Sequence, residues 1–173
     1  LKSYSTIPLE VDRLIISAYL RVNNVEVRNS FFIKSYIIEN DSKIEFDNLN
    51  EFIFVLKKEI QNFDIEALIE LFEFVISPSD RIINGAIYTP SDIREYIVEQ
   101  ALLRERNQLE NAKIADIACG CSGFLYTAAK ELKRRTGNSY EYIFRNQIFG
   151  LDIQEYSVTR SKILLNLLAL SEG

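Results

Sequence analysis

Residues 115–125, with the sequence A-D-I-A-C-G-C-S-G-F-L, constrain the fold of this chain more than any other segment. The apolar run over residues 112–118 has the length of a buried parallel strand, and the apolar residues after Gly123 recur at helical spacing. Gly120 and Gly123 lie at the junction, where glycine permits a positive φ and a close approach of the backbone to a ligand. The segment therefore predicts a strand, a turn and a helix N-terminus that together cradle a nucleoside cofactor.

A second short apolar run, residues 148–153, also reaches a carboxylate, Asp152. In an open α/β sheet, ligands bind beyond the carboxyl ends of the strands, and an acid at the end of the second strand commonly holds ribose hydroxyls. A carboxylate accepts hydrogen bonds from both hydroxyls at once. We therefore expect Asp116 and Asp152 to lie beside one cofactor site, at the ends of two neighbouring strands.

Three segments resemble the N6-adenine DNA methyltransferase family, in particular the modification subunits of type I restriction systems and their N-6 DNA methylase relatives. Residues 150–153, G-L-D-I, resemble the family's G-x-D motif, and residues 85–90, G-A-I-Y-T-P, resemble its G-x-[FY]-Y-T-P segment. The three segments follow the family's order and lie within residues 85–173. The family's cofactor motif, D-P-A-C-G-S-G-G-F-L, is matched here by Asp116, Ala118, Cys119, Gly120, Gly123, Phe124 and Leu125.

The resemblance implies an α/β protein, with an N-terminal helical domain over residues 1–84 and the first part of a Rossmann-like methyltransferase domain over residues 85–173. It implies a site-specific DNA methyltransferase that acts on adenine and uses S-adenosyl-L-methionine. The implied partners are DNA, bound through the full-length protein, and candidate specificity and restriction subunits. The cofactor-binding residues that it implies are Tyr88, Thr89, Pro90, Asp116, Ala118, Gly120, Gly123, Phe124, Asp152 and Ile153.

The sequence departs from the family pattern in two ways that matter. Ser122 stands where the family has the glycine that completes G-x-G, and a positive φ there would carry a strain of about 1–2 kcal/mol. The family's catalytic loop, N-P-P-[FY], is absent, since the only prolines are Pro8, Pro78 and Pro90. We therefore expect a truncated piece of a methyltransferase that holds no catalytic residue and is inactive alone.

Two other classes of protein stay open on the sequence. A nicotinamide or flavin dinucleotide enzyme is disfavoured, because the loop is not G-x-G-x-x-G and Asp152 lies beyond the roughly 20-residue interval of that fingerprint. A non-catalytic interaction module is favoured by the missing catalytic loop and by the amphipathic helices before residue 85.

Composition and charge limit the classes of protein and the kinds of site that fit this sequence. An apolar content of 47% with 26% charged residues suits a folded cytoplasmic protein, and no apolar run reaches membrane-spanning length. The net charge of −5 argues against a DNA clamp, and the basic cluster formed by Lys130, Lys133, Arg134 and Arg135 is best interpreted as a solvated helix end. We expect no metal site, because the chain has no histidine. Cys119 and Cys121 are too close in sequence for a disulfide and are expected to pack beneath the turn.

Residues 1–84 predict mostly helix, with the sequence S-P-S-D at residues 77–80 as the best boundary signal. Asp64 is the expected N-cap of the last helix before that boundary, and Thr89 is the expected N-cap of the next, with Pro90 in its first position. Residues 25–46 fit a helix or two strands, and we favour helix. The apolar faces of the expected helices comprise Leu9, Leu14, Ile15 and Ala18; Phe52, Val55, Leu56 and Ile60; Ile65, Leu68, Ile69, Phe72 and Ile76; and Ile93, Ile97, Val98 and Ala101.

Overall fold

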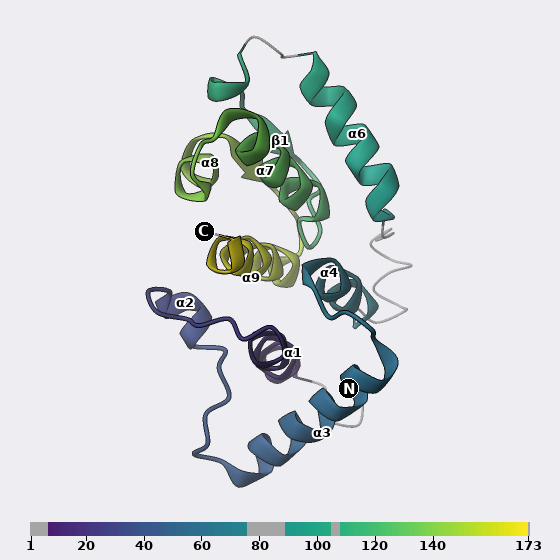
Figure 1. Ribbon diagram of the computed structural model, residues 1–173, viewed down its shortest axis with the longest axis vertical. Helices are drawn as coiled ribbons and strands as arrows, with labels where there is room; N and C mark the ends of the chain where they lie inside the picture. The colour runs from purple at the N-terminus through teal and green to yellow at the C-terminus, as the bar shows by residue number, and fades with distance from the viewer. Residues whose placement is uncertain (1–6, 76–88, 105–107, 173) are drawn as a thin grey trace. The chain divides into compact units, whose positions relative to one another are not determined.

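The computed structural model describes residues 7–75, 89–104 and 108–172 and divides the chain into two compact units, residues 1–71 and 72–173 (Figure 1). The domain boundary predicted between residues 84 and 85 lies outside the described residues, as do Ile76 and the S-P-S-D segment, so that boundary stays a prediction. None of the described helices combines the length and the apolar content that crossing a membrane would require.

The N-terminal unit is helical, with α1 (Pro8–Val22), α2 (Phe31–Lys34), α3 (Lys43–Glu59) and most of α4 (Ile65–Phe74). Helices α1, α3 and α4 confirm the three helices predicted for this region. The helix favoured for residues 25–46 is only partly correct, because α2 has four residues and α3 begins at Lys43. Tyr36 and Ile38 are held outside a helix by the Ser17 hydroxyl, which donates to Tyr36 O at 3.1 Å and accepts from Ile38 N at 2.8 Å.

Side-chain caps begin three helices of this unit. The Ser30 and Ser42 hydroxyls accept from the N–H groups of Ile33 and Glu45 at the starts of α2 and α3. Asp64 confirms the predicted cap of α4, because its Oδ1 accepts from Ala67 N at 3.0 Å. Each cap satisfies a backbone donor that has no acceptor within its own helix.

The core of the N-terminal unit forms where α1 packs against α3. Leu14 and Ile15 of α1 and Leu49 and Leu56 of α3 are buried. Leu9 and Val55, assigned to the same apolar faces by their spacing, are exposed at 56% and 46%. The buried stripes of α1 and α3 are therefore narrower than the apolar faces predicted from residue spacing.

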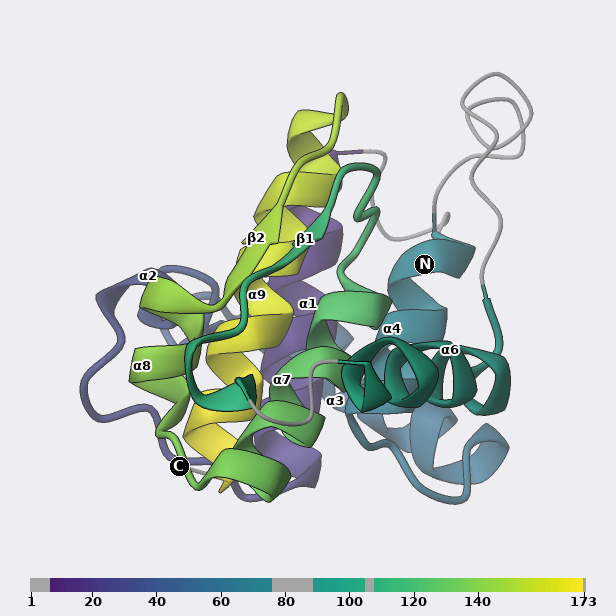
Figure 2. The same ribbon diagram turned by 90° about the horizontal axis from the view of Figure 1, so that it is seen from above.

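The C-terminal unit places two short parallel strands beside helices. Strands β1 (Ile114–Asp116) and β2 (Ile148–Gly150) pair with Ile114 opposite Ile148 and Asp116 opposite Gly150, and they lie side by side in Figure 2. Helix α7 (Gly123–Thr136) contacts both strands and also packs against α6 (Ser91–Leu103), α8 (Tyr140–Asn146), α9 (Glu155–Glu172) and the 3-10 turn η1 (Leu109–Asn111). These described elements give a mixed, helix-rich α/β unit.

Gln147 fixes the register of the two strands. Its side chain is 1% exposed and donates from Nε2 to Leu109 O and Ala112 O at 2.9 and 3.2 Å, while Oε1 accepts from Asn138 Nδ2 at 2.9 Å. Its main-chain carbonyl accepts from Ile114 N at 2.7 Å, at the start of β1. One buried amide therefore joins the segments that lead into both strands.

The length and the burial predicted for the first strand of this unit need correction. The strand predicted over residues 112–118 is shorter than expected and is not buried, since Ala115 is exposed and Ile117 is 80% exposed. Within the described chain β1 pairs only with β2, and Phe149 of β2 is also 45% exposed.

The predicted start of α6 is also wrong, and its predicted buried face is correct only at Val98. Pro90, with φ −52° and ψ 147°, occupies the N-cap position in place of Thr89, and no side chain caps the helix. The buried stripe consists of Arg94, Val98 and Leu102, while Ile93, Ile97 and Ala101 are exposed. The stripe follows i, i+4, i+8 spacing, but it starts at a charged residue, which hydrophobic periodicity does not count.

Tyr140 joins α8 to the end of α9. Its side chain is 3% exposed, and its hydroxyl donates to Glu172 Oε2 at 2.7 Å. Lys130 of α7 lies 3.6 Å from Glu172 Oε1, and Lys133 lies over the Tyr140 ring. Burial, with the Glu172 hydrogen bond second, raises the pKa of the Tyr140 hydroxyl above its ordinary range.

We predict that Tyr140→Phe lowers the free energy of unfolding by about 1.5 kcal/mol, because it removes a hydrogen bond to a charged group. The raised pKa means that this contribution is complete below about pH 10, where the unfolded tyrosine is protonated, and is lost as the pH rises further. Urea unfolding of both proteins at pH 7 and pH 11 measures the difference. Tyr142→Phe is the matched control, since the Tyr142 hydroxyl makes only an exposed 3.5 Å contact with Asn111. Equal effects of the two substitutions at pH 7 would contradict the prediction.

Candidate functional site

The parallel strands bring the two predicted acids to the same end of the sheet. Asp116 is the last residue of β1, and Asp152 follows β2 by two residues. The main-chain pairing continues past the strands, because Leu151 N donates to Asp116 O and Cys119 N donates to Leu151 O, both at 2.9 Å. The loops that follow β1 and β2 therefore leave the sheet together.

The Asp152 carboxylate holds these two loops in place. Oδ2 accepts from Gly120 N at 2.9 Å, and Oδ1 accepts from Gln154 N at 2.8 Å. Each carboxylate oxygen can accept a second hydrogen bond, so Asp152 keeps the capacity to bind hydroxyl groups. Asp116 Oδ1 accepts from Ala118 N at 3.1 Å, within its own loop.

Helix α9 holds the loop from another side. The buried Ser161 hydroxyl donates to Gly120 O at 2.8 Å, so both the N–H and the carbonyl of Gly120 are fixed by side chains of the segment after β2. Sequence reasoning missed Ser161, because nothing in the sequence distinguishes it from the other serines of α9.

The loop contains two left-handed residues before α7 begins. Gly120 has φ +51°, as its glycine predicts, and Ser122 has φ +69°, where the sequence offers no glycine. Ser122 is fully buried, and within the described part of the chain its Oγ has no hydrogen-bond partner. Both the backbone conformation and the buried hydroxyl make position 122 unfavourable for serine.

Gly123 begins α7, where first-turn N–H groups have no acceptor within the helix. Its φ is not in the left-handed region, so a different constraint selects glycine here. A Cβ at position 123 would lie 3.0 Å from Arg94 Nη1 and 3.4 Å from Arg94 Cδ. The Arg94 side chain would therefore have to shift by a few tenths of an ångström to accept a β-carbon at residue 123.

Arg94 is the main residue of this region that the sequence analysis missed. It is 1% exposed, donates from Nε to Thr127 Oγ1 at 2.8 Å, and donates from Nη1 to Thr89 O at 3.4 Å. The available signal was its spacing, four residues before Val98 and eight before Leu102, on the stripe that α6 buries.

The other predicted site residues differ in exposure. Phe124 is partly exposed, Ala118 is exposed, and Ile153 is 94% exposed. Thr89 is partly exposed and Pro90 is exposed, at the start of α6. Tyr88 lies outside the described residues. Ala118 and Ile153 thus leave apolar surface uncovered on the loops that carry the two acids.

Both cysteines are free and buried in the loop, as predicted. Burial is the largest influence and raises the pKa of the Cys119 thiol; neighbouring serine hydroxyls lower it in part, and the carboxylates of Asp152 and Asp116 raise it. Cys119 therefore stays protonated near neutral pH and acts as a packing group, since the thiolate is the reactive form.

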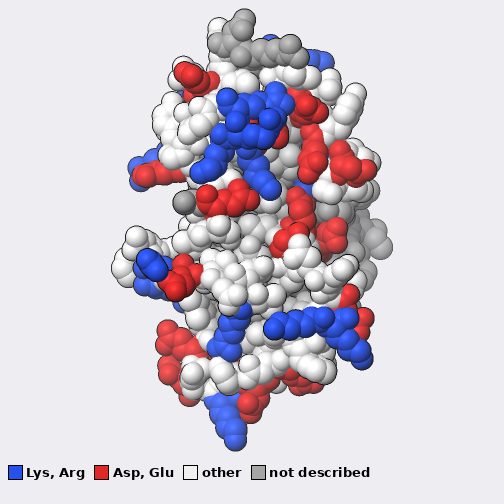
Figure 3. Space-filling view, viewed as in Figure 1, with Lys and Arg blue, Asp and Glu red and all other residues white. Residues whose placement is uncertain are grey.

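The basic cluster of α7 is engaged by neighbouring acids. Figure 3 shows Lys and Arg side chains gathered over α7, with acidic side chains beside them. Arg134 and Arg135 both pair with Glu131, and Arg135 also lies 3.8 Å from Glu99. The Arg134 side chain is 65% exposed and the Arg135 side chain is 14% exposed, so only part of the cluster is solvated as predicted.

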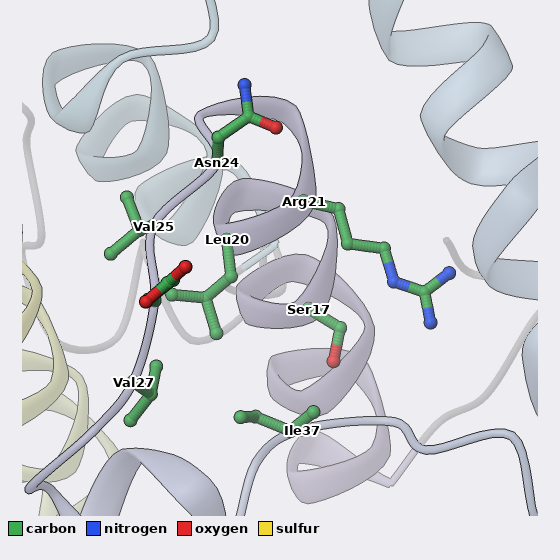
Figure 4. Close-up of a pocket in the computed structure, with 8 residues that line it drawn as sticks. Ser17, Leu20, Arg21, Asn24, Val25, Val27 and Ile37 are labelled. Atoms are coloured by element: carbon green, nitrogen blue, oxygen red, sulfur yellow. The ribbon is translucent and has the colours of Figure 1, made fainter.

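The N-terminal unit contains a separate pocket of about 460 Å³ beside the end of α1. Figure 4 shows Val25 and Val27 on one side, with Arg21 extending away from them. The Arg21 guanidinium lies 4.6 Å from the centre of the Phe46 ring and donates to Ile38 O at 3.5 Å. Ser17 is engaged by the main chain as described above, and none of the predicted site residues lines this pocket.

Comparison with known families assigns the chain to the methyltransferases. Residues 64–168 match the N-6 DNA methylase family, which is more than half of the 173 residues, so the chain belongs to this family of DNA methyltransferases. The match begins at Asp64, the cap of α4, and ends within α9. Comparison with curated proteins and with solved structures finds no match.

We predict that Ser122→Gly raises the free energy of unfolding by about 1 kcal/mol, because glycine adopts a positive φ without strain and the buried hydroxyl is removed. Ser122→Ala is the matched control, since it removes the hydroxyl and keeps the strain. Thermal and urea unfolding of the three proteins separate the two contributions. A loss of stability in Ser122→Gly would show that the left-handed conformation is not a source of strain.

Proposed function

We propose that this chain forms the S-adenosyl-L-methionine-binding part of a Rossmann-like, site-specific DNA methyltransferase that modifies adenine at N6 in a restriction-modification system. The observation that supports this most is the joint position of Asp116 and Asp152. Two parallel strands end side by side, and the Gly120 N–H links the Asp152 carboxylate to the loop that leads into α7. Ligands of open α/β sheets bind at this end of the strands.

The donor set suits the different parts of the methyl donor. Asp152 would accept from the ribose hydroxyls, and Asp116 would hold the methionine ammonium group directly or through water. The first turn of α7 offers N–H donors to the methionine carboxylate, together with the segment that contains Tyr88, Thr89 and Pro90. Ala118, Phe124 and Ile153 would border the adenine, with the loop from Gly120 to Gly123 passing beneath the cofactor.

The chemistry supplied by the bound donor is a sulfonium methyl group, transferred to the exocyclic nitrogen of adenine. The residues of this chain bind and orient the donor. The N-P-P-[FY] loop that contacts the flipped adenine in similar enzymes is not in the sequence, so we propose that target adenine recognition and transfer use residues outside residues 1–173.

We predict that calorimetric titration of this chain with S-adenosyl-L-methionine gives saturable binding, whereas NAD gives none. The distinction follows from the loop, in which Gly120 and Gly123 do not complete the G-x-G-x-x-G fingerprint of dinucleotide-binding enzymes. Binding of NAD alone would favour a dinucleotide enzyme. Absence of binding to either compound would favour an interaction module and overturn the proposal.

We predict that Asp152→Asn weakens adenosine binding by about 1–3 kcal/mol, because hydrogen bonds to a charged acceptor are lost. Adenosine and 2′,3′-dideoxyadenosine are titrated into the unchanged chain and the variant. Since dideoxyadenosine lacks both hydroxyls, its affinity should be the same for the two proteins.

Asp64→Asn is the control, because Asp64 is also a carboxylate that accepts from a backbone N–H, but it caps α4 in the N-terminal unit. An equal loss of adenosine and dideoxyadenosine binding in Asp152→Asn would assign Asp152 a purely structural role and remove the ribose contact from the proposal.

A further inference from the structure

A buried arginine lies at the junction of the two segments proposed to contact the methionine end of the donor. Arg94 is 1% exposed, and removing a guanidinium from water costs several kcal/mol unless hydrogen bonds replace its hydration. Val98 and Leu102, its neighbours on the buried stripe of α6, are apolar. A leucine at position 94 would continue that stripe without the cost, so packing alone does not account for arginine.

The hydrogen bonds of Arg94 form a continuous path. Thr89 O accepts from Nη1 at 3.4 Å, Nε donates to Thr127 Oγ1 at 2.8 Å, and that hydroxyl donates to Gly123 O at 3.1 Å. The path joins the start of α6 to the first residue of α7 through two side chains. Helices α6 and α7, which this path connects, pack against each other.

The electrostatics of this junction suit an anionic ligand. The N-terminus of α7 carries the partial positive charge of the helix dipole, and Arg94 Nη1 lies 3.0 Å from the Cβ position of Gly123. A carboxylate at the first turn of α7 is therefore favoured by the helix N-terminus, and Arg94 packs beside the residue that begins this helix.

We infer that Arg94 and Thr127 are positioning residues, which hold the Thr89–Pro90 peptide at a fixed distance from the first turn of α7 and thereby set the subsite for the methionine carboxylate. This inference rests on the proposed function. It concerns only one end of the donor: the ribose end, at Asp152 and Gly120, is held by other bonds.

Because the two ends are held separately, two ligands distinguish positioning from general structural support. Adenosine probes the ribose and adenine end, whereas S-adenosyl-L-methionine probes both ends. Thr127→Val removes the hydroxyl that accepts from Arg94 and donates to Gly123, and Thr127→Ser keeps it. Affinities for both ligands are measured by calorimetry, and unfolding midpoints are recorded for every variant.

The expected result is an about tenfold weaker binding of S-adenosyl-L-methionine to Thr127→Val, the size of one lost charge-assisted hydrogen bond. Adenosine affinity stays within about twofold, and Thr127→Ser restores S-adenosyl-L-methionine binding to within about twofold of the unchanged chain. Arg94→Lys should reproduce the selective loss, because one ammonium group does not replace the planar set of guanidinium donors. The double variant Arg94→Lys, Thr127→Val should lose less than the sum of the single losses.

An equal loss of both ligands, or no loss of either, would overturn the inference and leave the proposed function standing. Failure of the unchanged chain to bind either ligand would overturn both. If Thr127→Val does not fold, the ratio of the two affinities in Arg94→Lys decides the matter alone.

Discussion

The hydrogen bond from Gly120 N to the Asp152 carboxylate is the constraint on which the geometry of this region depends. It joins the loop after β1 to the segment after β2 at 2.9 Å, and the Ser161 hydroxyl fixes the carbonyl of the same residue, Gly120. These two hydrogen bonds restrict the conformation of the loop, and the loop in turn positions the start of α7. A three-residue strand pair would be a weak support alone, because short isolated strands are marginal in water. Side-chain hydrogen bonds stabilise the sheet at both ends: Gln147 makes them before the strands, and Asp152 makes them after the strands.

The pattern of glycines, acids and apolar runs predicted the central part of the C-terminal unit correctly. The left-handed Gly120, the helix that starts after Ser122 and the Asp64 cap of α4 follow from local chain chemistry, because they depend on a residue and its near neighbours. The parallel pairing joins distant segments, and it was predicted from two apolar runs that each reach a carboxylate. The match to the N-6 DNA methylase family confirms the membership that three short motifs had indicated.

The features that sequence reasoning missed depend on contacts between distant segments. Arg94 was assigned no role because a charged residue is expected at the surface, and its burial depends on Thr127, which lies 33 residues later. The same omission shifted the predicted face of α6. The strand over residues 112–118 was expected to be buried, but burial depends on a neighbouring layer, and the described chain offers β1 only one partner strand. The roles of the ten predicted cofactor residues stay a proposal.

The contact between Gly123 and Arg94 ties the evolutionary freedom of these two positions together. The neighbouring guanidinium favours glycine at position 123, because a β-carbon there would lie 3.0 Å from Arg94 Nη1, whereas the backbone angles of Gly123 do not require glycine. A β-carbon at position 123 is accommodated when the Arg94 side chain shifts by a few tenths of an ångström. The tolerance of position 123 to larger amino acids therefore depends on the residue at position 94, and the two positions are expected to vary together in homologous chains.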